Sequence, residues 1–410
     1  MKKLLLGAAA SAALFVGAAN AAVVPALPAG ANVYTLTVSG ASASQAYFEK
    51  YLTGVGLLPA KRLCAGAVTK HVDALIKDQF AYSCAANKVG NPTLAAAMGI
   101  KTVLLIKKRT DGGSGYGVGP VAADAAIPFL GGSAKPDFGL SDLAPSNFTS
   151  AFPYNAPAGV PGFPLTAAAI AAKLTVLSAP RQVFGVVVNT AFRNALQKAQ
   201  GKVVGNGLVV NMPSLTKAQI TSFIKTGTSG TLTGVYTCGR TNGSGTKAAT
   251  AQNICGAAGT ACQGTPATRY FELSASSGVS ECLSEINQGV NTLGTKFNNA
   301  PLKKGFAIGY QSTDVNALPP ATQLGTLGQY SFIKVNGVEP TLVKAAAGSY
   351  IDVSRSTCQY NKTAAAVAHL PVAKKALITQ ICQGIGNVAV INAVNPLVAK
   401  HTWGQAGFLP

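Results

Sequence analysis

Residues 182–189 read QVFGVVVN, an almost continuously apolar run of strand length. A strand that helices cover on both faces needs apolar side chains on both faces, which produces such a run in place of an alternating pattern. Residues 191–199 follow it with helical spacing, and the runs 33–38 and 102–106 are also strand-like and precede helix-like or turn-like segments. Strands that alternate with helices along the chain predict an α/β fold.

The chain has 410 residues, of which 48% are hydrophobic and 11% charged. That length accommodates two lobes of ordinary domain size. Residues 130–163 are rich in Gly and Pro and predict mostly loop, whereas residues 214–216 followed by 219–224 predict a capped helix. Residues 226–265 are rich in Gly, Thr and Ser and hold three cysteines, so we expect disulfides and turns to order them.

Residues 1–21 have the three parts of an export signal. Met1-Lys2-Lys3 is a short basic start, residues 4–16 are apolar, and residues 19–21 are the small-residue triplet Ala-Asn-Ala. These features predict a Sec signal peptide cleaved after Ala21, because the apolar stretch is shorter than the roughly 20 residues of a spanning helix. No Cys at the cleavage site can carry a lipid, so we expect an unlipidated protein that is periplasmic or secreted.

The chain is strongly basic, with 33 Lys and Arg against 13 Asp and Glu and a net charge of +20. A field of this sign attracts anions and anionic surfaces. Nucleic acid is one such partner, but the densest basic run is only Lys107-Lys108-Arg109, and no aromatic residues interleave with the charges. We therefore expect no specific nucleic-acid binding.

Eight cysteines lie beyond the signal segment, and none forms a C-x-x-C pair. An even number of cysteines in an exported chain predicts disulfides in place of zinc or redox sites. We expect Cys64–Cys84 and Cys358–Cys382, each of which closes a short loop. The other four allow three pairings that the sequence does not rank: Cys238, Cys255, Cys262 and Cys282.

Four short segments place small hydroxyl residues beside glycines where a strand ends and a helix or turn begins. They are residues 40–45 (GASASQ), 113–118 (GSGYGV), 137–142 (DFGLSD) and 240–246 (RTNGSGT). Helix N-termini leave backbone N–H groups free for an oxyanion, and an arginine adds a fork of donors. Taken singly, each segment is more often an ordinary turn or helix cap.

In this order, the four segments resemble the periplasmic phosphate-binding proteins of ABC transporters and the related secreted DING proteins. Further segments match the family pattern in sequence order: residues 183–189, 307–310, 336–341 and 348–350. The resemblance covers most of residues 33–350. It implies an exported protein that binds inorganic phosphate or a related oxyanion, for uptake or scavenging, with an ABC permease as a further partner.

The resemblance also implies an α/β fold of the two-lobe type II periplasmic-binding-protein class, with mixed sheets flanked by helices and a ligand cleft between the lobes. Lobe one would comprise residues 23–179 and 315–410, with an insertion at about 58–98, and lobe two residues 180–314. The chain would cross between lobes near residues 179–181 and return near 310–314. We expect a monomer.

Carried over onto this sequence, the family pattern assigns phosphate binding to residues from both lobes. Five positions depart from it, because Ser44 replaces a threonine, Gln45 an apolar residue, Gly115 a serine, Tyr116 a glycine and Asn242 an acid. No catalytic residue, cofactor or metal is expected. The predicted phosphate-binding residues are Ser44, Gln45, Ser114, Asp142, Arg240, Ser244, Gly245 and Thr246.

The sequence leaves two other functions open. A secreted phosphatase of DING-like type would need a metal cluster or an activated nucleophile with a base, yet His71, His369 and His401 all lie outside the four segments. An exported structural or adhesive protein could keep the fold and lose the ligand. The sequence favours a binding protein over both, and therefore not an enzyme.

Overall fold

The computed structural model describes residues 26–73, 76, 78–152, 157, 159–256, 262–264, 269–290, 304–314, 330–363 and 368–394, together with the backbone of 400–401, 404–405 and 408–409. The predicted signal peptide, residues 1–21, lies outside these ranges. Within them, none of the helices is both long and apolar enough to cross a membrane.

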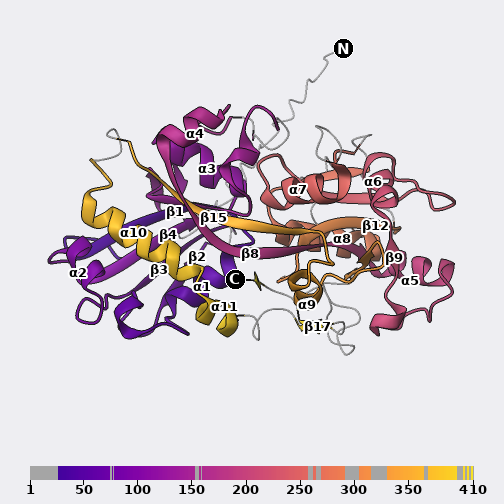
Figure 1. The fold of residues 1–410 in the computed structure, drawn as a ribbon, viewed down its shortest axis with the longest axis horizontal. Coiled ribbons are helices and arrows are strands. Elements are labelled where there is room, and N and C mark those ends of the chain that lie inside the picture. The colour runs from indigo at the N-terminus through magenta and orange to yellow at the C-terminus, as the bar shows by residue number, and fades with distance from the viewer. Residues whose placement is uncertain are drawn as a thin grey trace, which may run out of the picture.

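One mixed sheet of twelve strands runs through the described residues, flanked by helices (Figure 1). Its order is β11-β10-β12-β8-β15-β7-β1-β4-β3-β2, with β13 and β18 also paired to β8. The α/β class with a mixed sheet between helices is thus confirmed. The strands are β1 (Val33–Gly40), β2 (Thr69–Val72), β3 (Gln79–Ala85), β4 (Val103–Arg109), β7 (Phe138–Ser141), β8 (Leu174–Asn189), β10 (Tyr236–Arg240), β11 (Tyr270–Leu273), β12 (Ala307–Ser312), β13 (Tyr330–Phe332), β15 (Val353–Asn361) and β18 (Phe408–Leu409).

The first body, at the left of Figure 1, is built on β1, β4 and β7, which run parallel. Side chains alternate between the two faces of a strand, so Leu36 of β1 and Leu104 of β4 enter the same core. The helices packed in that core are α1 (Gln45–Leu52), α2 (Pro92–Met98), α10 (Val372–Ile385) and α11 (Val388–Val394). On the other face, Ser39 Oγ donates to Tyr116 O of α3 (Ser114–Ala123) at 2.7 Å.

The second body, at the right of Figure 1, is built on β10, β11 and β12 and has its own buried cores. Thr216 caps the predicted helix at residues 217–226 with a reciprocal hydrogen-bond pair to Gln219. The helices of this body are α5 (Thr190–Ala199), α6 (Lys217–Thr226), α7 (Gly245–Thr250), α8 (Ser276–Gln288) and α9 (Leu342–Ala346).

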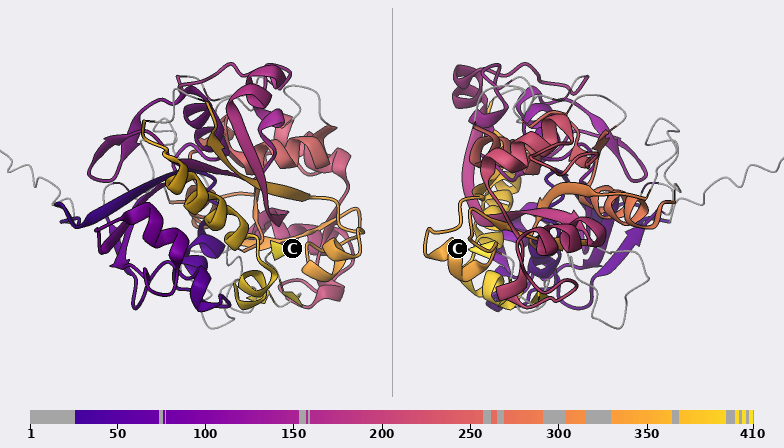
Figure 2. Two further views of the ribbon diagram at one scale, coloured as in Figure 1. Left: turned by 60° about the vertical axis from the view of Figure 1, so that its left-hand side comes forward. Right: turned by 90° about the vertical axis from the view of Figure 1, so that its right-hand side faces the viewer.

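Strands β8 and β15 lie side by side between the two bodies, as Figure 1 and Figure 2 both show. Residues 174–183 of β8 pair antiparallel with β15, whereas residues 184–188 pair with β12. The apolar run that predicted a covered strand is therefore the part of a 16-residue strand that enters the second body. A single strand thus contributes to both bodies.

One expected boundary differs from the structure. Residues 315–410 were expected in lobe one, but β13 pairs with residues 187–189 of β8. Ile333, Val335 and Tyr350 are buried in the same core as Val183 of β8. These apolar side chains keep the described residues from 330 to 352 with the second body. The chain therefore returns to the first body through β15 and not at residues 310–314.

Four disulfides join all eight cysteines, and none of them links one body to the other. The predicted pairs Cys64–Cys84 and Cys358–Cys382 are confirmed. The four central cysteines, whose pairing the sequence left open, form Cys238–Cys282 and Cys255–Cys262. Cys238 lies in β10 and Cys282 in α8, so this bond fastens a helix to the sheet of the second body.

Candidate functional site

Two glycine-rich turns from different bodies are in direct backbone contact. One follows β4 and the other follows β10, and the Gly115 amide donates to Gly243 O at 2.8 Å across the junction. Gly245 of the second body is just as close to the first body, because a Cβ placed on it would lie 2.3 Å from Ser114 Oγ and 2.6 Å from Asp142 Oδ2. The two turns thus pack as tightly as residues without side chains allow.

The first body brings three predicted residues to this junction because β1, β4 and β7 are parallel and end at one edge of the sheet. Ser44, Ser114 and Asp142 follow or end these strands, and all three are buried. The Ser44 hydroxyl donates to Ala41 O at 2.6 Å. The Ser114 hydroxyl accepts from the Asp142 amide at 2.9 Å, which fixes the turn before α3 against the end of β7.

Gln45 is placed beside these residues, but its side chain has other partners. Its Nε2 donates to Glu49 Oε1 at 2.7 Å and also to the Tyr82 hydroxyl. Its backbone amide donates to Ser42 O at 3.1 Å. Gln45 is therefore held within α1 and against β3, and it is the predicted residue with the weakest geometric support for a ligand contact.

Arg240 ends β10 in the second body and is only 1% exposed. Its Nε donates to Leu273 O at 3.0 Å and its Nη2 to Ser274 O at 2.9 Å, while Nη1 donates to Ser276 Oγ at 3.0 Å. An arginine has five N–H donors in a rigid fork, so these three bonds fix the guanidinium and leave two donors over. Arg240 is thus oriented before any ligand arrives.

The remaining predicted residues begin α7 in the second body. Ser244 is the N-cap, and its hydroxyl accepts from the Lys247 amide at 3.3 Å. Within the described residues, Thr246 Oγ1 is buried and has no hydrogen-bond partner, and the same is true of Asp142 Oδ1. Leaving a buried polar atom unpaired costs about 1–3 kcal/mol, so the junction holds both a hydroxyl and a carboxylate oxygen that a ligand could satisfy.

The charges at the junction act on one another. Burial raises the pKa of Asp142 to about 6, although the hydrogen bond from Ser114 and the charge of Arg240 oppose this rise. Burial likewise lowers the pKa of Arg240, against the attraction of Asp142. Asp314, whose pKa burial raises to about 6, adds a like charge near Asp142.

No protein-family model matches the chain, and no curated protein matches it. Three of the solved structures to which it is similar are bacterial. One is assigned as a phosphate ABC transporter substrate-binding protein from Clostridium perfringens, with bound phosphate (13% identity, 91% of this chain and 99% of that chain, TM-score 0.47). Another is an ABC-type phosphate transport receptor from Vibrio cholerae (11% identity, 85% of this chain and 93% of that chain, TM-score 0.39). The third is PstS from Borrelia burgdorferi (10% identity, 91% of this chain and 98% of that chain, TM-score 0.38).

Sequence reasoning missed Ser276, the first residue of α8. Its hydroxyl accepts from Arg240 and lies 3.5 Å from the hydroxyl of Ser42, which belongs to the turn between β1 and α1. The signal was present, because residues 274–278 (SASSG) follow β11 with the same small-residue composition as the four segments. Ser276 joins the turn of one body to the arginine of the other.

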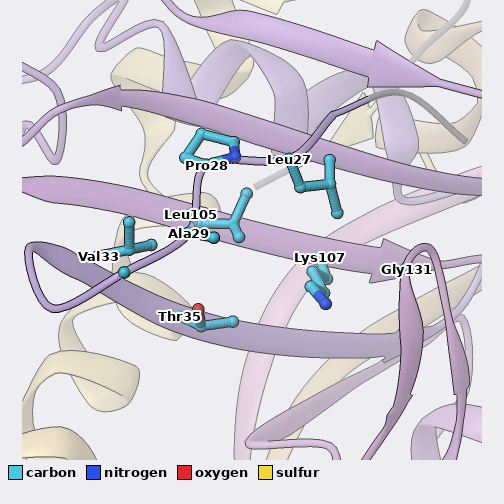
Figure 3. A pocket seen from close by; sticks show the side chains of 9 residues that line it. Leu27, Pro28, Ala29, Val33, Thr35, Leu105, Lys107 and Gly131 are labelled. Carbon is cyan, nitrogen blue, oxygen red and sulfur yellow. The ribbon is translucent and has the colours of Figure 1, made fainter.

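A pocket of about 440 Å³ elsewhere in the first body contains none of these residues. It lies against β1 and β4, and Lys107 is its charged residue (Figure 3). Two histidines have partners that do not belong to the junction: His71 hydrogen-bonds to Ser83, and His369 pairs with Asp124. No cluster of three or more His, Cys, Asp or Glu residues suited to a metal occurs in the described ranges.

Proposed function

We propose that the protein binds inorganic phosphate, or a chemically similar tetrahedral oxyanion, at the junction of its two bodies. The observation that carries the proposal is the buried and unpaired Asp142 Oδ1 and Thr246 Oγ1 beside the fixed guanidinium of Arg240. An anion removed from water must be paired by charge and by hydrogen bonds. The junction supplies a cation, hydroxyl donors and one acceptor for a proton that the anion still carries.

The proposed binding residues come from both bodies, so a bound anion would hold the two bodies together. Ser44 and Ser114 belong to the first body, and Arg240 and Thr246 to the second. Because Gly245 touches Ser114 and Asp142, the anion would enter only when the bodies separate. Strands β8 and β15 are the elements about which such a hinge motion would occur.

The role that fits this site is that of an exported solute-binding protein, periplasmic or secreted, which captures phosphate for uptake or scavenging. An ABC permease in the inner membrane is the partner that such a role requires. Support for export comes from the pattern of residues 1–21. Support for binding in place of hydrolysis comes from the junction itself, which brings Asp142 and Arg240 together without bringing His71 or His369 to them.

The direct test is calorimetric titration of the protein lacking residues 1–21. We expect a saturable 1:1 isotherm with phosphate and no heat of binding with methylphosphonate or sulfate at matched concentrations. Phosphate that fails to bind, under conditions where thermal unfolding shows the protein to be folded, would refute the proposal.

Gly245→Ala is expected to weaken phosphate binding by about 1–3 kcal/mol, as overpacking of a close contact does. The added methyl would meet Ser114 Oγ and Asp142 Oδ2 and hold the two turns apart. The matched control is Gly66→Ala, because nothing lies within 4 Å of a Cβ at that position. Titrations of both variants with phosphate check this, and equal affinities would place the anion elsewhere.

A further inference from the structure

Lys108 is fully buried in the first body, at 0% exposure, next to the turn that carries Ser44. It lies opposite Val38 in the pairing of β4 with β1. Because side chains alternate along a strand, Lys108 shares the inner face of β4 with Leu104 and Ile106, which are buried in the core of the first body. A lysine is almost never fully buried without a charged partner, so this position needs an explanation.

The ammonium of Lys108 lies behind the turn between β1 and α1. Its Nζ donates to Ala41 O at 3.3 Å, and the same carbonyl accepts from Ser44 Oγ at 2.6 Å. Among the described residues, this is the single hydrogen bond of an ammonium that has three protons, and no carboxylate lies within ion-pairing distance of it. Phe48 of α1 places its ring 5.8 Å from Nζ.

The charged groups around Lys108 come from several elements. Asp142 beyond β7 and Glu49 of α1 attract its charge, and Lys70 of β2 repels it. Glu49 is already engaged, because it accepts from Lys70 at 2.6 Å and from Tyr82 of β3 at 2.7 Å. Asp142 is therefore the acid through which Lys108 is coupled to the junction.

We propose that Lys108 is a second cation of the anion site and selects the doubly charged form of the oxyanion, hydrogen phosphate. The inference rests on the proposed function. Arg240 and Asp142 have opposite charges, so together they leave a dianion unbalanced. The ammonium of Lys108 supplies a further positive charge from behind the turn that carries Ser44.

The coupling between anion binding and protonation of Lys108 has a definite sign. Burial lowers the pKa of Lys108 to about 7, and a nearby anion favours the ammonium and so raises that pKa on binding. Binding then takes up a proton above about pH 7. The contribution of Lys108 to affinity is complete where the lysine is charged in both states, below about pH 7, and it is lost as the pH rises through the pKa of the bound state.

The experiment compares the phosphate affinity of the wild type with that of Lys108→Met from about pH 6 to about pH 9. Methionine keeps much of the side-chain length and removes the charge. We expect the dissociation constant of Lys108→Met to exceed that of the wild type about tenfold or more at the lowest pH, and the ratio of the two constants to approach one at the highest pH. Comparing the two proteins at each pH removes the contribution of titrating groups that Lys108 does not affect.

Lys107→Met is the matched control. Lys107 directly precedes Lys108 in β4, and its replacement by methionine removes the same charge. Its side chain faces the pocket of Figure 3 on the other side of the sheet. We expect Lys107→Met to leave the affinity within about twofold, because Lys107 is only half-buried and lies on the opposite face of β4 from Lys108, where salt screens its charge. A ratio that is the same for both variants, or that does not change with pH, would overturn the proposal.

A measurement on the wild type alone remains valid even if Lys108→Met does not fold. Binding heats at about pH 8, measured in two buffers of different ionisation enthalpy, are expected to show proton uptake on phosphate binding. Absence of uptake overturns the role of Lys108, as does uptake that Lys108→Met retains. If the wild type does not bind phosphate at all, the proposed function fails; if it binds without this linkage, only the role of Lys108 fails.

Discussion

Arg240→Ala is expected to weaken phosphate binding by about 2–5 kcal/mol, the cost of leaving a buried charge without its partner. The guanidinium is fixed by Leu273 O, Ser274 O and Ser276 Oγ, so the Arg240 side chain is already ordered when the anion arrives. In the variant, Asp142 also loses the positive charge that opposes its raised pKa. Calorimetric titration with phosphate measures the loss directly.

Arg193→Ala is the control for removing a buried arginine. Arg193 lies in the second body, and burial lowers its pKa also, but its Nη1 donates to Ser331 Oγ, away from the junction. We expect both alanine variants to lower the free energy of unfolding and only Arg240→Ala to lower affinity. An affinity of Arg240→Ala within about threefold of the wild type, where a charge contact predicts far more, would remove Arg240 from the site.

The wild type is expected to bind phosphate with negligible competition from sulfate. An ionised carboxylate can only accept hydrogen bonds, so the unpaired Asp142 Oδ1 suits an anion that still carries a proton and repels one that does not. Sites that require a specific hydrogen bond reject an analogue that lacks it by roughly 10⁴–10⁵. Asp142→Asn can donate as well as accept, so it should keep phosphate binding and lose part of this discrimination.

The same discrimination should depend on pH. Because burial raises the pKa of Asp142 to about 6, the carboxyl is protonated below that pH and can donate to sulfate. Sulfate competition should therefore grow more steeply as the pH falls through about 6 in the wild type than in Asp142→Asn, where only the titration of other groups, phosphate included, still changes it. If Asp142 only caps the following turn, the variant should instead lose about 1 kcal/mol of stability with unchanged selectivity.

Local patterns predicted the elements that hold the site. The apolar run 182–189 lies within β8, and both short-loop disulfides are present. Three of the hydroxyl-rich segments lie where a helix begins after a strand, and the fourth, residues 137–142, contains β7 itself. These features depend on neighbours in the sequence, such as strand periodicity, glycines at tight turns and cysteines about twenty residues apart. The meeting of residues 113–118 with 240–246 was implied by the family resemblance, and the Gly115–Gly243 hydrogen bond shows that they meet.

Features that depend on distant pairing were not predictable from these patterns. In sequence, Lys108 belongs to a basic run typical of a solvated surface, and only the pairing of β4 with both β1 and β3 buries it. The segment 330–352 was expected in lobe one, but its apolar residues are buried in the core of the second body, and no local pattern indicates which core they join. Which helix covers a strand face is decided by residues far away along the chain.

The position of β15 has a consequence for how the chain folds. This strand completes the first body from near the far end of the chain: Thr357 Oγ1 donates to Leu143 O across 214 residues, and Gln359 Nε2 donates to Gly117 O across 242. To form contacts between residues so far apart, the chain must close large loops, and the entropic cost of closure comes before the contacts stabilise the fold. Such contacts therefore slow folding. Until β15 docks, one edge of β7 and the first half of β8 lack their partner strand. We expect docking of β15 to limit the rate of refolding, with aggregation through these open edges as the competing reaction.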